Sequence, residues 1–461
     1  MSNGTSHGTD PDHTFDVIVI GLGPGGEHVA GSLAERGLRV LALDDRLVGG
    51  ECPYWGCIPS KMMIRAADAL AEARRVDGLA GSVGEVTPDW SVVAQRIRDE
   101  ATDNWDDQVA VDRLVGKGAT FVRGRAVING PGRVDVDGTA YTATTGIVVN
   151  TGTTPQVPPI DGLAGTPYWT NHEIVEATEL PASIIVLGGG AIGCELSQVM
   201  ARFGVEVTVV EAADRILALE EPEASRVLAE TFESEGITVR AGVGAEKVDH
   251  DGDTFTVTLA DGSTLTAERL LVATGRRTDL QAVGLHHVGV AKDARSVPVD
   301  DRCRVTDGVW AVGDITGKGA FTHVSMYQAG IVIRDVLGDD GPPASYAALP
   351  RVTFTDPEVG SVGLTEKQAR DTLDAVQVGV TPLGETTRGW IAKSDGLIKL
   401  VADADRGVLV GATTMGPAGG EVLGALAVAV HAEVPIDTLR SMIYAYPTLH
   451  RGIEDALGRL E

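Results

Sequence analysis

A strand–turn–helix–strand pattern occurs twice in this chain, and the duplication restricts the folds open to it. In each copy an apolar run ends in three closely spaced glycines, a helical stretch follows, and a second apolar run ends in an acidic residue. In the first copy, which starts at Phe15, these residues are Gly21, Gly23, Gly26 and Asp44. In the second copy, which starts at Ser183, they are Gly188, Gly190, Gly193 and Glu211. The acid follows the first glycine by 23 residues in both copies.

A G-x-G-x-x-G motif between a strand and a helix, with an acid at the end of the next strand, is typical of dinucleotide-binding folds. The glycines permit a tight turn and let the backbone approach a pyrophosphate, which binds at the N-terminus of the helix. The acid accepts hydrogen bonds from an adenosine ribose. Two copies therefore predict two bound dinucleotides.

The resemblance between the copies continues beyond the motif. Each copy has an Asp-Gly hairpin signal, in "VDVDGTAYT" and in "VTLADGSTL". An apolar strand then runs into a Thr-Gly turn, which includes Thr151 and Gly152 in the first copy and Gly275 in the second. The sequence thus predicts an α/β protein with two similar Rossmann-like domains.

Composition restricts the partners of the chain. Its 461 residues are 43% hydrophobic and carry a formal net charge of −27. Because this charge opposes binding to nucleic acid or to an anionic bilayer, a small-molecule substrate is expected. No apolar run reaches the length of a membrane span. The polar residues 1–14 lack an apolar h-region, which predicts a disordered leader and a cytoplasmic enzyme.

The segment "GGECPYWGCIPSK" contains two of the four cysteines, Cys52 and Cys57. Residues five apart on a regular helix point roughly 140° away from each other, so a bridge between them needs a distorted turn, which Pro53 and Gly56 favour. Pro59 suits a first helical position, which places Cys57 near a helix N-terminus that favours a thiolate. A redox disulfide beside a flavin is the favoured interpretation. Two alternatives are a metal site, for which further Cys or His ligands are lacking nearby, and a pair of buried small residues.

This segment resembles the redox-active motif of the flavin-dependent pyridine nucleotide–disulfide oxidoreductases, a family that includes dihydrolipoamide dehydrogenase, glutathione reductase and mercuric reductase. The resemblance covers nearly the whole chain. "TDGVWAVGDITG" is similar to the second flavin-binding signature of the family, with Asp314 at the ribitol chain. "FTHVSMYQAG" is similar to the start of the helix that faces the flavin pyrimidine, near His323. "VTFTDPEVGSVGLTE" is similar to the opening of the C-terminal interface domain.

The resemblance implies roles for four residues of the redox centre. Cys52 would be the interchange thiol, which meets the substrate, and Cys57 the charge-transfer thiol, which lies against the flavin. Lys61 would lie near flavin N5 and pair with Glu195 of the second nucleotide domain. Their ordinary alternatives are a solvated lysine and a helix glutamate. Glu51 departs from the threonine common at its position in the family.

The first domain is expected to bind FAD and the second a nicotinamide dinucleotide. The residues expected to bind these cofactors are Gly21, Gly23, Gly26, Asp44, Gly50, Lys61, Thr151, Gly152, Asp314, His323, Gly188, Gly190, Gly193, Glu211 and Gly275. The charge of Glu211 would repel a 2′-phosphate, so NAD(H) is expected in preference to NADP(H), although Arg215 lies close enough in sequence to compensate in part. No metal site is expected.

The C-terminal segment "YAYPTLHRGIEDAL" departs from the family, which has a histidine before Pro-Thr and a glutamate five residues after the histidine. Tyr446 takes the place of the histidine and Arg451 that of the glutamate. Ordinary pKa values of about 10 for Tyr and about 6.5 for His mean that deprotonation of an unshifted tyrosine costs roughly 5 kcal/mol more, so at neutral pH Tyr446 would be a poor base for a thiol. Tyr446 is expected among the catalytic residues, and as a neutral side chain it could donate a proton, bind a metal ion or pack. A displaced pair of His450 and Glu454 is a further possibility.

The expected function is electron transfer from NAD(P)H through FAD to a Cys52–Cys57 disulfide and on to an unidentified disulfide, dithiol or other acceptor. Mercuric reductases also have a tyrosine in place of the histidine, so reduction of a metal ion is an alternative. Against it, mercuric reductases end with an additional cysteine pair that hands over the metal, whereas no cysteine follows Cys303 here, and no separate N-terminal metal-binding domain is expected. Direct transfer from flavin to a quinone is a second alternative. Cys194 and Cys303 are expected to be structural.

The expected organisation has five segments. They are the leader (1–14), an FAD domain with the redox segment (15–155), an NAD domain (156–275), a returning FAD segment (276–344) and a dimerisation domain (345–461). A homodimer is expected because the resemblance implies that each active site includes the Tyr446 segment of the partner.

Overall fold

A computed structural model describes residues 13–461, so residues 1–12 of the expected leader lie outside the described chain. Thr14, placed in the leader above, begins the first strand. The described chain divides into two compact units. The first contains residues 13–59, 96–155 and 276–345, and the second contains residues 60–95, 156–275 and 346–461. No helix among the described residues is long and apolar enough to cross a membrane.

The first unit is built on a sheet of eight strands, with the order β16-β17-β6-β1-β2-β3 and a hairpin of β4 and β5 joined to β6. Its helices and strands are β1 (Thr14–Ile20), α1 (Pro24–Glu35), β2 (Val40–Asp44), α2 (Glu51–Tyr54), η2 (Ile97–Ala101), α5 (Gln108–Gly116), β3 (Thr120–Arg123), β4 (Ala126–Gly130), β5 (Arg133–Val136), β6 (Thr139–Val149), β7 (Thr154–Pro155), β15 (Arg276–Arg277), η3 (Leu285–Val288), β16 (Arg304–Thr306), β17 (Val309–Ala311), η4 (Asp314–Thr316) and α9 (Thr322–Leu337).

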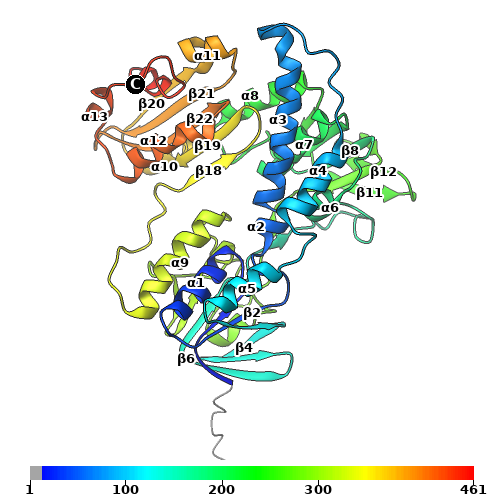
Figure 1. Ribbon diagram of the computed structural model, residues 1–461. Coiled ribbons are helices and arrows are strands. Elements are labelled where there is room, and N and C mark those ends of the chain that lie inside the picture. Colours follow the sequence, from blue (N-terminus) through cyan, green and yellow to red (C-terminus); the bar gives the residue numbers. More distant parts are fainter. Residues whose placement is uncertain (1–12) are drawn as a thin grey trace, which may run out of the picture. The chain divides into compact units, whose positions relative to one another are not determined.

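β1 is the central strand of this sheet because both of its faces are apolar. Ile18 and Ile20 pack into the core on one face, while Val17 and Val19 pack into the core on the other. Strands buried on both faces are typical of parallel sheets covered on each side. α1 lies beside α9 over this sheet (Figure 1). The carboxyl end of β1 thereby delivers the first glycine turn to the N-terminus of α1.

The second unit contains a parallel sheet, β10-β9-β8-β14, a three-stranded sheet, β11-β12-β13, and an antiparallel sheet, β18-β19-β22-β21-β20. Its helices and strands are α3 (Cys57–Leu79, which starts in the first unit), α4 (Trp90–Arg96), α6 (Asn171–Glu176), β8 (Ser183–Leu187), α7 (Ala191–Arg202), β9 (Glu206–Glu211), α8 (Pro222–Ser234), β10 (Thr238–Ala241), β11 (Ala245–His250), β12 (Phe255–Leu259), β13 (Thr264–Ala267), β14 (Arg269–Val272), β18 (Pro350–Thr353), β19 (Glu358–Gly363), α10 (Glu366–Thr372), β20 (Val376–Pro382), η5 (Leu383–Glu385), α11 (Thr387–Ala392), β21 (Leu397–Asp403), β22 (Val408–Gly416), α12 (Gly419–His431), α13 (Ile436–Arg440) and α14 (Gly452–Leu457).

The two nucleotide folds share a strand order. β6-β1-β2-β3 in the first unit corresponds to β14-β8-β9-β10 in the second, and all of these pairs are parallel. The Asp-Gly hairpins are also present. Asp137 and Gly138 both have positive φ and connect β5 to β6, as a two-residue primed turn requires. The duplication expected from the sequence is therefore a duplication of structure.

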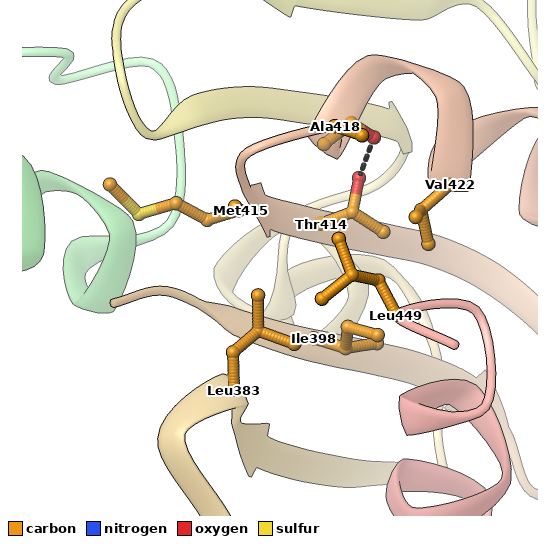
Figure 2. Close-up of a pocket in the computed structure, with 9 residues that line it drawn as sticks. Leu383, Ile398, Thr414, Met415, Ala418, Val422 and Leu449 are labelled. Carbon is orange, nitrogen blue, oxygen red and sulfur yellow. Dashed lines mark hydrogen bonds between the residues drawn. The ribbon is translucent and has the colours of Figure 1, made fainter. Parts of the chain in front are cut away.

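The C-terminal sheet has its own core. α12 packs on β19 and β22, and α14 packs on β20 and β21. Figure 2 shows a small cavity in this core, lined mostly by apolar side chains that include Leu383, Ile398 and Leu449. Thr414, its polar member, donates a hydrogen bond to the carbonyl of Gly419 over 2.7 Å. A volume of about 10 Å³ is at the limit for one water molecule, so this cavity is a packing feature.

Candidate active site

The first and third glycines of each motif are required by the close approach of backbone. Gly21 has a φ of 86°, and a Cβ added there would lie 2.5 Å from the carbonyl oxygen of Asn150. A Cβ on Gly26 would lie 2.0 Å from the carbonyl oxygen of Gly21. Gly188 and Gly193 repeat this arrangement, with 2.5 Å to Ala273 and 1.9 Å to Gly188. No larger residue fits either turn without moving the backbone.

The second glycine of each motif has open space in front of it. A Cβ added to Gly23 would come no closer than 3.6 Å to any neighbouring atom, and one added to Gly190 would have no neighbour within 4 Å. This space lies at the N-terminus of α1 and of α7, where backbone N–H groups and the helix dipole attract a phosphate. The residues present therefore fit a dinucleotide pyrophosphate at both turns.

The acids at the ends of β2 and β9 fasten the glycine turns. Asp44 accepts hydrogen bonds from the backbone N–H of Leu22, at 2.6 Å, and of Arg46, at 2.7 Å. Glu211 accepts equivalent bonds from Gly189, at 2.6 Å, and from Ala213, at 2.7 Å. Burial raises the pKa of Asp44, although these two backbone donors oppose the effect. Each carboxylate still has lone pairs that can accept a hydrogen bond from a ribose hydroxyl. The motif alone did not indicate that these carboxylates also bind the backbone of the turn.

Arg215 does not neutralise Glu211. Its guanidinium donates to the backbone carbonyls of Leu217, at 3.0 Å, and Ala218, at 2.9 Å. The ion pair by which Arg215 could have offset the charge of Glu211 is therefore not formed in this arrangement.

Cys52 and Cys57 lie on two separate helical segments. Cys52 belongs to α2, Cys57 begins α3, and Trp55 and Gly56 interrupt the helix between them. The distortion expected from the sequence is present, but the expected start of the second helix at Pro59 is wrong by two residues. Pro59 instead occupies the first turn of α3, where its missing N–H removes no intrahelical bond.

The environment of the two thiols favours negative charge on Cys57. Its Sγ lies 3.3 Å from Oγ1 of Thr322, the first residue of α9, so the positive ends of two helix dipoles are close to it. Neither cysteine is part of a disulfide in the structure. A hydrogen bond with Cys57 and then burial raise the pKa of Cys52. The hydroxyl of Thr322, which contacts Cys57, opposes these two effects on Cys52.

Lys61 follows Cys57 by one turn of α3, and the structure brings it together with Glu195 of α7. Nζ of Lys61 lies 2.8 Å from Oε2 of Glu195, while Oε1 accepts a hydrogen bond of 2.8 Å from the backbone of Phe354. Nζ also lies 4.6 Å above the centre of the Phe354 ring. Glu195 is almost fully buried and Lys61 is partly exposed, so the ammonium is the accessible member of the pair.

Asp314 belongs to a polar network of the first unit. Oγ1 of Thr153 donates to Oδ2 of Asp314 over 2.9 Å and accepts from Nε of Arg276 over 2.7 Å. Nη2 of Arg276 lies 3.3 Å from Oε2 of Glu51, which gives a partner to the residue that departs from the family threonine. Burial raises the pKa of Asp314, while Thr153 and Arg276 lower it.

The remaining residues expected to bind the cofactors are Gly50, Thr151, Gly152, His323 and Gly275. A Cβ on Gly50 would lie 3.0 Å from Cα of Gly23, so the redox segment packs directly on the first glycine turn. Thr151 and Gly152 follow β6, and Gly152 has a φ of 63° with open space around an added Cβ. His323 lies in the first turn of α9 and stacks on Phe321, with ring centroids 5.0 Å apart. Gly275, with a φ of 127°, ends the corresponding turn of the second unit.

The two sequence models that match the chain are those of pyridine nucleotide-disulphide oxidoreductases, over residues 15–329, and of the dimerisation domain of the same proteins, over residues 349–457. The chain belongs to the pyridine nucleotide-disulphide oxidoreductase family. A dihydrolipoyl dehydrogenase of Chlorobaculum tepidum is 34% identical over 453 residues and covers 96% of both chains. A mercuric reductase of Bacillus cereus is 30% identical over 97% of this chain and 71% of its own length.

Solved structures agree with this membership. The Cu(II) complex of the HOCl-induced flavoprotein disulfide reductase RclA of Escherichia coli has a TM-score of 0.84, 25% identity and coverage of 96% of this chain and 99% of its own. LpdA of Mycobacterium tuberculosis has a TM-score of 0.84, 26% identity and coverage of 96% and 99%. The predicted fold class, enzyme class and homodimer are confirmed, and the family uses FAD and a pyridine nucleotide.

In this oxidoreductase Tyr446 is exposed, and the contacts of its segment differ from the displaced His450–Glu454 pair considered from the sequence. Tyr446 is 65% exposed, and its hydroxyl donates to Oγ1 of Thr387 over 3.3 Å. Arg451 stacks on the ring of Tyr446 at 5.4 Å and pairs with Glu454 at 3.0 Å. The ring of His450 packs on Tyr444 instead. Glu454 therefore orients Arg451, and the displaced His450–Glu454 pair is not formed in the described part of the chain.

Cys194 and Cys303 are both fully buried. Sγ of Cys194 donates to the carbonyl of Gly189 over 3.3 Å, and burial raises the pKa of this thiol. These environments make both side chains packing residues rather than nucleophiles. No cluster of three or more His, Cys, Asp or Glu suited to a metal ion occurs in residues 13–461.

Proposed function

We propose that the enzyme takes electrons from NADH in preference to NADPH and delivers them to a disulfide formed by Cys52 and Cys57. FAD, when bound at the turn of Gly21, Gly23 and Gly26, supplies the two-electron chemistry that links the nucleotide to the cysteines. Asp44 and Asp314 would bind its sugar chains, and Gly50, Thr151, Gly152 and His323 would surround it. Gly188, Gly190, Gly193, Glu211 and Gly275 would hold the nicotinamide dinucleotide. The proposed location of the enzyme is the cytoplasm.

The observation that carries this proposal is the unequal environment of the two thiols. Two electrons and one proton convert the disulfide to a thiol and a thiolate. The N-termini of α3 and α9 would stabilise a thiolate on Cys57, and the proton would then stay on Cys52, whose pKa is raised by its hydrogen bond with Cys57 and by burial. Cys52 is then the thiol that exchanges with the substrate, and Cys57 the one that faces the flavin.

Lys61 and Glu195 are proposed to act on the charge near the flavin. Glu195 is fixed by the backbone of Phe354 and holds the Lys61 ammonium at 2.8 Å. A fixed positive charge favours electron density that develops beside it, and a partly buried site strengthens this effect. Tyr446 is proposed to complete the site of the partner subunit, as a proton donor or a contact for substrate rather than as a base.

Replacement of Cys52 by Ser tests the disulfide route. Turnover of NADH is measured for the parent and Cys52→Ser proteins with a small disulfide, such as lipoamide, and with a quinone. Loss of activity with the disulfide and retention with the quinone supports the proposal. Equal activity of the two proteins with every acceptor would contradict it and favour direct transfer from the flavin.

Reduction of a metal ion is the second candidate, because the mercuric reductase of Bacillus cereus is 30% identical over nearly all of this chain. The exposed Tyr446 also matches that class by resemblance. NADH-dependent consumption of Hg²⁺ that is lost in both Cys52→Ser and Tyr446→Phe would favour this candidate over a disulfide substrate.

A further inference from the structure

Ion pairs occur at regular intervals along one face of α3. Lys61, Asp68 and Arg75 are seven residues apart, which on a helix is about 10 Å and close to two full turns. Lys61 pairs with Glu195 at 2.8 Å, Asp68 with Arg202 at 2.6 Å, and Arg75 with Asp356. The Lys61 pair, nearest the N-terminus of α3, is thus the first of three.

Two of these pairs join α3 to α7 with a constant spacing. Lys61 and Glu195 are 134 residues apart in sequence, and so are Asp68 and Arg202. A constant offset means that the two helices run parallel and in register along this contact, where Figure 1 shows them side by side. The charges of these paired residues alternate in sign along the contacting face of each helix. A slip of seven residues would therefore place Lys61 against Arg202, or Asp68 against Glu195, and like charges would meet.

Arg202 is the centre of this arrangement. Its side chain is only 3% exposed and contacts three carboxylates, those of Asp68, Glu235 at 2.7 Å and Asp356 at 2.8 Å. A buried guanidinium costs free energy unless such partners surround it, and its main recognised use is to specify one register among alternatives. The contacts of Arg202 join α3, the end of α8 and the segment after β18.

The segment after β18 gives Arg202 a second connection to the Lys61 pair. Gln198, one turn before Arg202 on α7, accepts a hydrogen bond from the Asp356 backbone N–H, at 2.7 Å, and donates one to its carbonyl, at 2.8 Å. Two residues earlier, the N–H of Phe354 donates to Glu195 and its ring lies under Nζ of Lys61. Arg202 and Gln198 therefore both bind Asp356, two residues after the Phe354 that contacts Glu195 and Lys61.

We propose that Arg202 and Asp68 are positioning residues that fix the register of α3 on α7 and thereby hold Lys61 against Glu195. The catalytic meaning of that pair rests on the proposed function, but the register itself does not. Removal of the Asp68 charge is the mildest perturbation, because Asp68 is 37% exposed and asparagine keeps the carbonyl acceptor. Arg202→Lys is the second variant, since a lysine cannot reproduce the forked contacts to three carboxylates.

The test measures how fast Lys61 is acylated by acetic anhydride in the folded holoenzyme, with labelling read by mass spectrometry. An amine released from its carboxylate partner reacts faster, so Asp68→Asn and Arg202→Lys should each raise the labelling rate about threefold, in keeping with the strength of partly exposed ion pairs. Asp68→Glu keeps the negative charge and should be labelled at the parental rate. Asp77→Asn, which removes an exposed charge from the same helix, is the matched control and should leave the rate unchanged.

A second measurement connects the register to the redox centre. In the reduced enzyme, Asp68→Asn should shift the pH midpoint of the long-wavelength thiolate-to-flavin absorption, and it should cause no further shift in a Lys61→Met background. Parental Lys61 labelling in both Asp68→Asn and Arg202→Lys would overturn the proposal, as would equal shifts with and without Lys61. Absence of the absorption in the parent protein would contradict the proposed function alone, because the labelling rates would still decide the role of Arg202.

Discussion

Replacement of Glu211 by Ala should move the coenzyme preference of this enzyme from NADH towards NADPH. Glu211 ends β9 and binds the backbone N–H groups of Gly189 and Ala213. Alanine removes the charge that opposes a 2′-phosphate and releases these two donors, which can then bind the phosphate. Arg215 donates to backbone carbonyls and not to Glu211, so the substitution removes the carboxylate without breaking an ion pair between these two residues.

The size of the effect follows from the charge alone. Two unit charges about 4 Å apart near a protein surface interact by about 4 kcal/mol, and salt reduces this value. A net change of about 2–3 kcal/mol corresponds to roughly 30- to 150-fold in the ratio of kcat/KM for NADPH to that for NADH. Weaker fastening of the glycine turn affects both coenzymes and cancels in the ratio.

Steady-state kcat/KM for both coenzymes with one acceptor measures this ratio, and stopped-flow reduction of the flavin measures it without an acceptor. Glu246→Ala is the control, because Glu246 is an exposed acid of the same nucleotide fold. A ratio in Glu211→Ala within about threefold of the parental value would refute the electrostatic reasoning. So would a parent protein that already prefers NADPH.

Two further predictions concern the fold and its pH dependence. Gly193→Ala should lower the free energy of unfolding by about 1–3 kcal/mol, because the added Cβ would lie 1.9 Å from the Gly188 carbonyl oxygen. Gly190→Ala should leave the free energy of unfolding unchanged and raise KM for the nucleotide. Urea unfolding and steady-state kinetics of the two variants measure these effects. Asp335→Asn should cost about 1–3 kcal/mol at pH 7. Burial raises the pKa of Asp335, but Arg304 and Trp310 outweigh it and hold the pKa below its ordinary value. The stabilisation by the Asp335 carboxylate is present above its unfolded pKa of about 3.9 and is lost as the pH falls through its folded pKa. Urea unfolding should therefore show a smaller loss of stability in Asp335→Asn at low pH than at pH 7. An equal loss at both pH values would contradict this role of the carboxylate.

The dinucleotide turns could be predicted from the sequence because their chemistry is local. The glycines and the acid of each motif lie within one strand–helix–strand unit, and the spacing fixes their geometry. The second role of Asp44 and Glu211 was not predicted, because the motif gives the position of the carboxylate but not the direction of the backbone N–H groups that meet it. The start of α3 at Cys57 was missed for a similar reason, since a proline is tolerated throughout the first turn.

Contacts between distant segments could not be derived from spacing. The Lys61–Glu195 pair was expected only by resemblance, as its members are 134 residues apart. Thr322 beside Cys57 gave no signal in the sequence, because a hydroxyl at a helix start is ordinary. The heptad of alternating charges on α3 could have been noticed, but its partners on α7 become evident only when the two helices are packed together.

An anaerobic reductive titration of the parent, Cys52→Ser and Cys57→Ser proteins tests the central claim most directly. The account predicts that the parent takes up twice as many electrons as its flavin alone and develops the long-wavelength thiolate-to-flavin absorption after the first half. Cys52→Ser should show this absorption before any reductant is added, because the Cys57 thiolate remains, and Cys57→Ser should never show it. A parent protein that takes up only the electrons of its flavin, with no such absorption at any stage, would contradict the account.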